Sequence, residues 1–309
     1  MEKLEKEYDV VIVGGGPAGY CAALYCARAN LSCAVIEKFV PGGQMGTTDK
    51  VDNYPGFEEG IGGYELSVKM QKGAERFGVE TIIETVTQLE LKSVPKKVKT
   101  AKAIYHAKVV ILATGASPRA LGLENEKELI GRGVSYCATC DGMFFKNKEV
   151  VVVGGGNTAV ADALYLAKIC AKVSIVHRRD SLRASKTYMN QLKLAENVEI
   201  IWNSTIQEIQ ASEHVEAVKV KDKDTCQVTK IACSGIFVAV GNVPNSELLV
   251  GQVELNESGY VLADETTRTN IPGVFAIGDI REKQLRQIVT AVADGAVASH
   301  YAEEYLNTL

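Results

Sequence analysis

The chain has 309 residues, of which 46% are hydrophobic and 23% charged, with a formal net charge of −4. This length and composition fit a folded protein with two sizeable cores and exclude a disordered chain. Charges of both signs are spread along the sequence, which argues against nucleic acid as the main partner. The longest apolar runs, such as residues 10–13 and 150–153, are too short to cross a bilayer, and the first residues lack the apolar stretch of a signal peptide. We therefore expect a cytoplasmic protein with no membrane partner.

The sequence contains eight cysteines, and Cys137 and Cys140 stand only three positions apart. Thiols at this spacing suit either reversible disulfide exchange or half of a metal site. A tetrahedral zinc site needs two more nearby ligands, and the sequence has no second Cys-x-x-Cys and no suitably spaced Cys-His pair. A zinc-bound structural or sensor protein is the non-enzyme alternative, and we predict no metal ligands. The other cysteines are expected to be buried thiols in helices or strands: Cys21, Cys26, Cys33, Cys170, Cys226 and Cys233.

The first motif is a glycine turn between a predicted strand, residues 8–13, and a predicted helix that continues to residue 30. Three glycines shape this turn: Gly14, Gly16 and Gly19. They allow a tight turn, close approach of a pyrophosphate, and close packing of the helix on the strand. Free N–H groups at the helix start attract phosphates. A second strand over residues 33–36 ends at Glu37, the acid expected to bind a ribose hydroxyl.

Loop and strand signals follow this first unit. Two Gly- and Pro-rich stretches within residues 41–56 are typical of loops that can wrap a ligand. A helix is predicted over residues 63–77 and β-hairpins over residues 79–106. A buried strand over residues 109–112 runs into Ala113-Thr114-Gly115, another turn that permits close approach of a ligand.

A second copy of the pattern begins at residue 149. A strand over residues 149–153 ends in a glycine turn at residues 154–159, and a helix-like run continues to residue 171. A strand over residues 173–176 follows. Three residues beyond it are expected in the core of this unit: Trp202, Ile206 and Ile209.

The two units differ at one equivalent position. Glu37 stands 23 residues after Gly14, and His177 stands 23 residues after Gly154. Three arginines follow the histidine: Arg178, Arg179 and Arg183. An acid suits a ribose with free hydroxyls, whereas a cluster of His and Arg suits a 2′-phosphate, because Arg offers a planar fork for phosphate oxygens. The second unit is therefore expected to prefer NADPH over NADH, the alternative being a solvated basic turn.

Beyond the second unit, a strand over residues 236–240 leads into a linker at residues 242–245. A further strand ends in Gly278-Asp279, and Arg286-Gln287-Ile288 starts a helix expected to run to about residue 305. The pattern predicts an α/β fold with two Rossmann-like (three-layer ββα) nucleotide-binding domains, the second inserted in the first. Two nucleotide sites with a thiol pair between them suggest that electrons move from a nicotinamide through a flavin to sulfur.

The whole chain resembles the low-molecular-weight, bacterial-type thioredoxin reductases, which are class II pyridine nucleotide-disulfide oxidoreductases. The matching motifs, in the family's order, are Gly14 to Gly19, Gly42-Gly43-Gln44, Asn53-Tyr54-Pro55-Gly56, Ala113-Thr114-Gly115, Cys137-Ala138-Thr139-Cys140-Asp141-Gly142, Gly154 to Ala159, His177-Arg178-Arg179, Gly278-Asp279 and Arg286-Gln287. The resemblance implies a homodimeric FAD enzyme that passes reducing equivalents from NADPH to thioredoxin disulfide.

The resemblance also implies site residues. FAD would be bound by Gly14, Gly16, Pro17, Ala18, Gly19, Glu37, Lys38, Gly42, Gly43, Gln44, Asn53, Ala113, Thr114, Gly115, Gly278, Asp279, Arg286, Gln287 and Ile288. NADPH would be bound by Gly154, Gly156, Asn157, Thr158, Ala159, His177, Arg178, Arg179 and Arg183. Cys140 would face the flavin, Cys137 would attack thioredoxin, and Asp141 would donate and accept protons. The candidates for the thioredoxin contact surface are Arg132, Met143, Phe144 and Phe145.

By the same resemblance, residues 1–116 and 247–309 would form a discontinuous FAD-binding domain, and residues 117–246 an NADPH-binding domain that includes the redox dithiol. A reductase of the same fold that uses ferredoxin or NADH as donor, or another dithiol protein as acceptor, is the enzyme alternative. The branch resembling glutathione reductase is disfavoured, because its redox pair belongs just after the first ribose acid and residues 39–46 contain no Cys.

Overall fold

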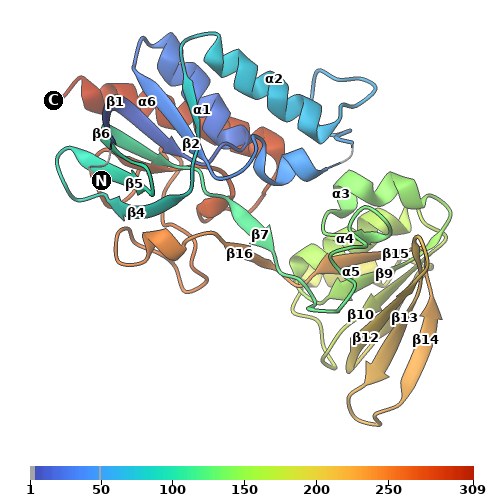
Figure 1. Cartoon of the computed structure of the whole chain (residues 1–309). Coiled ribbons are helices and arrows are strands. Elements are labelled where there is room, and N and C mark those ends of the chain that lie inside the picture. The colour runs from blue at the N-terminus through green and yellow to red at the C-terminus, as the bar shows by residue number, and fades with distance from the viewer. Residues whose placement is uncertain (1–3, 49) are drawn as a thin grey trace. The chain divides into compact units, whose positions relative to one another are not determined.

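The computed structural model describes residues 4–48 and 50–309, and the chain divides into two compact units (Figure 1). Unit 1 comprises Met1–Ser117 and Val243–Leu309, and unit 2 comprises Pro118–Asn242. Two short strands that connect the units, β7 (Ala116–Pro118) and β16 (Asn242–Pro244), pair with each other. The second unit is thus inserted in the first.

Unit 1 is built on one large sheet. Its elements are β1 (Leu4–Val13), α1 (Pro17–Arg28), β2 (Cys33–Glu37), η1 (Gly43–Thr47), α2 (Gly63–Glu75), β3 (Glu80–Ile83), β4 (Val86–Glu90), β5 (Lys96–Thr100), β6 (Ala103–Leu112), η3 (Glu247–Leu249), β17 (Val274–Ala276), η4 (Gly278–Ile280) and α6 (Ile288–Leu306). The strand order is β3-β2-β1-β6-β5-β4, and β17 pairs with β6. Strands β3, β2, β1, β6 and β17 run parallel, which brings the turns after β1, β6 and β17 to one edge.

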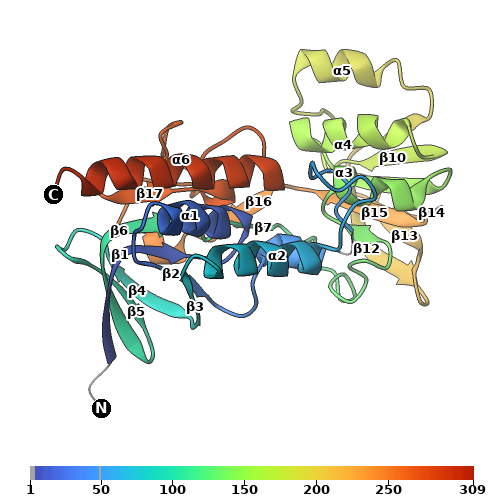
Figure 2. The ribbon, with the colours of Figure 1, turned by 90° about the horizontal axis from the view of Figure 1, so that it is seen from above.

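The parallel part of this sheet is covered on both faces. Val10 and Ile12 of β1 contribute to one cluster with α1 and α6, which Figure 2 shows side by side, whereas Val11 and Val13 contribute to another. This explains why residues 10–13 are a continuous apolar run rather than an alternating one, since a parallel strand buries both of its faces. Burial of each such side chain contributes about 1.5–3 kcal/mol.

Unit 2 repeats the parallel core on a smaller scale. Its elements are β8 (Val134–Ser135), α3 (Ala138–Asp141), η2 (Gly142–Phe145), β9 (Glu149–Gly154), α4 (Asn157–Ala167), β10 (Lys172–Val176), α5 (Lys186–Leu192), β11 (Val198–Ile201), β12 (Ser204–Ala211), β13 (Val215–Asp222), β14 (Val228–Ala232) and β15 (Gly235–Ala239). The parallel sheet has the order β11-β10-β9-β15-β8, and β12-β13-β14 form a separate antiparallel sheet. Together the two units confirm the predicted α/β fold.

Three expectations from the sequence are wrong. Strand β3 pairs parallel with β2 rather than in a hairpin, so the antiparallel meander is confined to β4, β5 and β6. Cys226 is exposed, because it lies in the turn between β13 and β14 with a φ of 60°. Trp202 is 36% exposed in the turn after β11, whereas Ile206 and Ile209 are buried as predicted.

Candidate active site

The first glycine turn is sterically closed at two positions and open at a third. A Cβ on Gly14, whose φ is 112°, would lie 2.3 Å from the Ala113 carbonyl oxygen. A Cβ on Gly19 would lie 2.0 Å from the Gly14 carbonyl oxygen. Around Gly16, by contrast, no described atom lies within 4 Å of the Cβ position. The backbone at Gly16 is thus open to an approaching group at the start of α1.

Glu37, at the end of β2, reaches back to this turn. Its Oε2 accepts a hydrogen bond from the Gly15 N–H at 2.7 Å, and its Oε1 accepts one from the Phe39 N–H at 3.2 Å. The next residue, Lys38, is exposed, and its ammonium lies 4.8 Å from the centre of the Phe39 ring. The Glu37 carboxylate therefore lies directly at the first glycine turn.

Other predicted segments meet the same turn. The Gly42 N–H donates to the Gly15 carbonyl at 2.7 Å, which holds the residue 42–44 loop against it. The Gln44 side-chain amide donates to the Ala116 carbonyl. A Cβ on Gly278, at the end of β17, would lie 3.0 Å from the Ala18 Cβ. Segments far apart in the sequence thus converge at the carboxyl edge of the sheet, where α/β folds bind ligands.

The start of α6 forms a further wall. Asn53 donates through Nδ2 to Gln287 Oε1 at 3.0 Å, and Gln287 caps the helix that begins at Ile288. The Arg286 guanidinium lies 4.2 Å from the centre of the Tyr260 ring. Burial raises the pKa of Asp279, and the positive charges of Arg286 and Lys283 partly oppose this shift.

The turn at residues 113–115 is fixed by a residue that sequence reasoning placed in a linker. Asn245 donates through Nδ2 to the Thr114 carbonyl at 2.8 Å, and the Thr114 hydroxyl donates to the Asn245 carbonyl at 2.8 Å. The Asn245 N–H also donates to the Gly115 carbonyl at 3.0 Å. An asparagine directly after a proline was the only signal available in the sequence.

The second glycine turn has the same open and closed pattern. A Cβ on Gly154 would lie 2.4 Å from the Ala239 carbonyl oxygen, whereas no described atom lies within 4 Å of the position on Gly156. At the N-terminus of α4, Asn157 accepts a hydrogen bond through Oδ1 from the Ser185 N–H at 2.8 Å. Thr158 is exposed there and Ala159 is buried.

His177 occupies the place over Gly155 that Glu37 occupies over Gly15. A Cβ on Gly155 would lie 2.1 Å from the imidazole, which is only 6% exposed and meets Trp202 edge to face at 6.3 Å. The His177 ring nitrogen Nε2 lies 3.0 Å from the Ser181 carbonyl. Burial lowers the pKa of His177, with Arg179 and Arg178 adding to the shift.

The three arginines beside this histidine lie at the surface. Arg178, Arg179 and Arg183 are exposed, and within residues 4–48 and 50–309 none of them forms an ion pair. The Arg183 N–H donates to the Gly155 carbonyl at 2.7 Å, which brings that arginine to the glycine turn. Their side chains are therefore available to an anionic ligand.

Cys137 and Cys140 form a disulfide, with Cα atoms 5.3 Å apart, at the start of α3. The cross-link lies after β8 and before β9, in the unit that contains the second glycine turn. Ala138 packs in the same cluster as Ala159 of α4, so α3 and α4 share one core. Asp141, which ends α3, accepts a hydrogen bond through Oδ2 from the Ser135 hydroxyl at 2.6 Å. Sequence reasoning missed Ser135.

Apolar side chains near the disulfide fall into two groups. Met143 is 54% exposed and Phe144 is 48% exposed, and Arg132 is exposed as well. Phe145 instead packs edge to face against Phe237 at 5.3 Å. Met143 and Phe144 are thus at the surface, whereas Phe145 contributes to the core of unit 2.

Comparison with known proteins identifies the family. Residues 8–295 match the family described as pyridine nucleotide-disulphide oxidoreductase. The chain is 46% identical to a thioredoxin reductase of Peptoclostridium acidaminophilum over 98% of both chains, and 47% identical to one of Listeria innocua over 100% of this chain and 97% of that protein. A crystal structure of thioredoxin reductase from Streptococcus pyogenes has 46% identity and a TM-score of 0.89, covering 98% of this chain and 99% of that one.

The chain belongs to the pyridine nucleotide-disulphide oxidoreductases, in the group of thioredoxin reductases. It is an oxidoreductase, and membership implies a flavin and a pyridine nucleotide. The residues present fit such groups. Both glycine turns leave space at Gly16 and Gly156, and the buried Nε atom of Arg286 has no hydrogen-bond partner among the described residues. A phosphate or a ring carbonyl would supply hydrogen-bond acceptors for the backbone N–H groups of the turns and for Arg286 Nε.

The Gly278-Asp279 turn is held by an ionic cluster that was not predicted from the sequence. Asp294 of α6 accepts hydrogen bonds from the Gly278 N–H at 2.9 Å, from Arg281 Nε and Nη2 at 2.9 Å each, and from Lys283 Nζ at 2.8 Å. Burial alone would raise the pKa of Asp294, but the hydrogen bonds and positive charges of Arg281 and Lys283 lower it overall. The cluster fixes the turn that presents Asp279.

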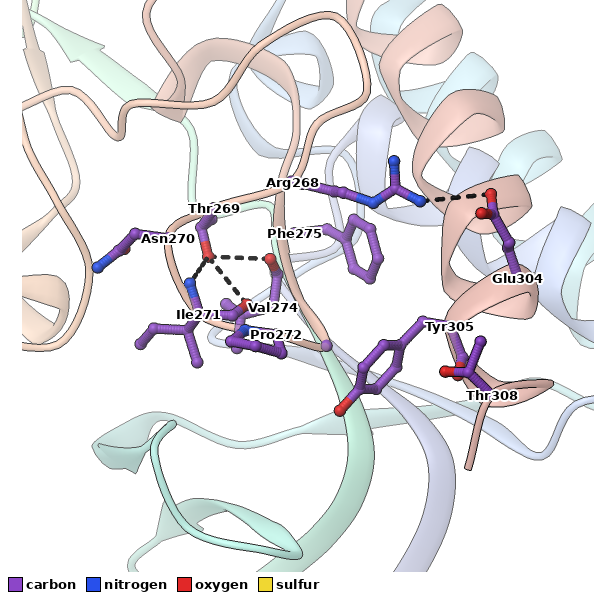
Figure 3. Close-up of a pocket in the computed structure, with 11 residues that line it drawn as sticks. Arg268, Thr269, Asn270, Ile271, Pro272, Val274, Phe275, Glu304, Tyr305 and Thr308 are labelled. Carbon is purple, nitrogen blue, oxygen red and sulfur yellow. Dashed lines mark hydrogen bonds and ion pairs between the residues drawn. The ribbon is translucent and has the colours of Figure 1, made fainter.

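A cavity of about 340 Å³ lies elsewhere in unit 1, between the loop before β17 and the end of α6 (Figure 3). Its walls include Ile271, Phe275 and Tyr305, and Arg268 at its rim is paired with Glu304 at 3.3 Å. None of the predicted site residues lines it.

Two features of the described residues concern metal ions and membranes. Across residues 4–48 and 50–309, no group of three or more His, Cys, Asp or Glu side chains is arranged to hold a metal ion. Over the same ranges, no helix is long and apolar enough to cross a membrane.

Proposed function

We propose that the protein reduces thioredoxin disulfide with electrons that pass from NADPH through FAD and the Cys137–Cys140 pair. The observation that carries this proposal is the disulfide at the start of α3, in the same core as the second glycine turn. Bound FAD would take up two electrons as a hydride equivalent and pass them on to a disulfide. Thioredoxin reductases at 46% and 47% identity support the acceptor.

We infer the cofactor assignments from the two turns. In unit 1, Gly14 to Gly19 and Glu37 would hold the adenosine and pyrophosphate of FAD, and Asn53, Asp279, Arg286 and Gln287 the remainder. In unit 2, Gly154 to Ala159 would hold the pyrophosphate of NADPH. The exposed Arg178, Arg179 and Arg183 would bind its 2′-phosphate, because a guanidinium pairs with phosphate oxygens through two parallel hydrogen bonds. Buried His177 would contribute to the same site from its position against Gly155.

The chain's own groups would do the sulfur chemistry. Cys140 would face the flavin and Cys137 would attack the thioredoxin disulfide, while Asp141 would exchange protons with the thiols. Exposed Met143 and Phe144, with Arg132, would contact thioredoxin, since exposed apolar side chains beside a reactive group suit a docking surface. The residues that connect the two units, near 116–119 and 243–248, would allow the NADPH-binding unit to move during turnover. We also propose a homodimer in the cytoplasm.

An anaerobic titration tests the electron route. Two equivalents of NADPH per flavin should bleach the flavin absorbance, because the disulfide and FAD each take one electron pair, and oxidised thioredoxin should restore it. Cys137→Ser and Cys140→Ser should each abolish thioredoxin reduction while NADPH still bleaches the flavin, because the thiols act after the flavin.

Cys226→Ser is the matched control, because Cys226 is an exposed thiol in the turn between β13 and β14. It should leave both steps unchanged. Loss of NADPH-driven bleaching in Cys140→Ser, or retained turnover in Cys137→Ser, would contradict the route.

A further inference from the structure

Ser135 joins the disulfide helix to the carboxyl group at its end. It is the last residue of β8, pairs with Phe237 of β15, and is only 3% exposed. Its Oγ accepts a hydrogen bond from the Cys137 N–H at 3.1 Å and donates to Asp141 Oδ2 at 2.6 Å. One buried hydroxyl therefore contacts both the first cysteine and the acid.

The direction of the Ser135 hydrogen bond follows from its neighbours. The hydroxyl has one hydrogen, and its other acceptor within reach is the Cys137 carbonyl at 3.3 Å. That carbonyl already accepts the N–H groups of Cys140 and Asp141 at 3.2 and 3.1 Å. The hydrogen of Ser135 therefore points to the Asp141 carboxylate, where a charge-assisted bond is stronger.

The same hydroxyl also suits a protonated Asp141. The carboxylic acid would then donate to Ser135 Oγ, and the hydroxyl hydrogen would turn to the Cys137 carbonyl. Both protonation states are satisfied by rotation of one hydrogen, without movement of heavier atoms. Because Ser135 is buried, water does not readily take its place.

We propose that Ser135 is a positioning residue that holds Asp141 for proton exchange with the dithiol and sets the pH at which this exchange occurs. The proposal rests on the proposed function of Asp141. In the step towards the acceptor, the Asp141 carboxylate takes the proton of the attacking thiol, and the thiolate forms a bond to one sulfur of the acceptor disulfide. The acceptor S–S bond breaks, its electron pair leaves on the other sulfur, and that thiolate takes the proton back from Asp141.

Other titratable groups around Asp141 are identifiable. On its own helix these are Cys137 and Cys140, and before it Tyr136, whose hydroxyl donates to Glu126 at 2.7 Å. Helix α4, which packs on residues 138–142, includes Asp162 and Tyr165. Burial raises the pKa of Asp162 to about 6, so Asp162→Asn is needed as a control.

The test uses the prereduced holoenzyme in a Cys226→Ser background, with 4,4′-dithiodipyridine as the disulfide probe in stopped flow between pH 5 and 9. Its leaving group needs no acid, so the rate reports deprotonation of the attacking thiol. The acidic limb is the part of the rate–pH profile in which the rate falls towards low pH. Ser135→Ala should move this limb to higher pH by about one to two units, because the Asp141 carboxylate loses a charge-assisted hydrogen bond and its pKa rises. Ser135→Thr should restore the limb, and Ser135→Val, which has the shape of Thr without the hydroxyl, should not. This second pair keeps the test valid if the alanine variant fails to fold.

Asp141→Asn distinguishes this inference from the proposed role of Asp141. It should move the limb up to the pKa of the thiol itself, because the thiol then loses its proton to water. Ser135→Ala should add no further pH shift in that background, whereas Asp162→Asn should leave the limb in place. A limb that moves in Asp141→Asn but stays in place in Ser135→Ala and Ser135→Val, or a rate that these two serine variants lower equally at every pH, overturns the inference alone. A limb unchanged in Asp141→Asn overturns the proton role of Asp141 and the inference with it.

Discussion

The two glycine turns have the same backbone plan but different side chains at their centres. In unit 1 a carboxylate, Glu37, accepts the N–H of Gly15 at 2.7 Å, and in unit 2 an imidazole, His177, packs on Gly155. Gly16 and Gly156 are open in both. The two turns thus share their backbone geometry. They differ in the side chain that packs on the middle glycine, Glu37 or His177, and in the residues next to it.

The largest effect on stability is expected at the last residue of each glycine turn, which is Gly19 in unit 1 and Ala159 in unit 2. A Cβ on Gly19 would lie 2.0 Å from the Gly14 carbonyl oxygen, whereas its counterpart Ala159 already has a Cβ. Gly19→Ala should destabilise unit 1 by about 3 kcal/mol, because backbone must move to admit the methyl group. Ala159→Gly, the matched control, should cost only about 1 kcal/mol through helix propensity.

Two spectroscopic signals follow the units separately during urea unfolding of these variants. Flavin fluorescence reports on unit 1, where we propose that FAD binds, and the single tryptophan, Trp202, reports on unit 2. Gly19→Ala should change the first signal and leave the second in place. Equal losses in Gly19→Ala and Ala159→Gly would contradict the steric difference between the turns.

The next effect should appear at the open glycines and concern ligands rather than folding. Gly16→Ala and Gly156→Ala meet no described atom within 4 Å, so the apoprotein should keep its unfolding midpoint. A methyl group there would meet an incoming pyrophosphate, and affinity should fall about tenfold to a hundredfold, which is about 1.4–2.8 kcal/mol. Fluorescence titration with FAD should detect the loss only in Gly16→Ala, and titration with NADPH only in Gly156→Ala. Loss of both ligands in either variant would refute independent turns.

Much of this arrangement could be predicted from the sequence, because glycine turns and the strand ends beside them are local features. Glu37 and the start of α6 were found in this way. The contact of Asp294 with Arg281 could not, because only the tertiary fold brings α6 to the turn that contains Arg281. The contact of Ser135 with Asp141 spans six residues and depends on the path of the chain between β8 and α3, which no sequence pattern specifies. The predicted burial of Trp202 and Cys226 was wrong because both residues lie in turns between short strands, where residue type does not decide burial.

A smaller effect is expected from the basic cluster that has no counterpart beside Glu37. Arg178→Ala combined with Arg179→Ala removes two exposed guanidinium groups and leaves the glycine turn intact. The ratio of kcat/KM for NADPH to that for NADH should fall at least tenfold, about 1.4 kcal/mol, mainly through a higher KM for NADPH. Lys38→Ala, at the exposed position after the acid of unit 1, is the control and should leave the ratio unchanged. An unaltered ratio in the double variant would assign the cluster to a solvated surface turn.

The smallest effect separates the two central side chains by pH. Because burial lowers the pKa of His177 in the folded protein, the unfolded chain binds the proton more readily below the ordinary value of 6.5. Stability of unit 2 should therefore decrease as the pH falls through about 6.5, by at most about 1 kcal/mol down to pH 5.5. Urea unfolding followed by Trp202 fluorescence measures this slope, and His177→Gln should flatten it. If the slope persists in that variant, another group in unit 2 is responsible, and the imidazole is not the titrating difference between the turns. Asp162 is not that group, because its raised pKa makes stability increase as the pH falls.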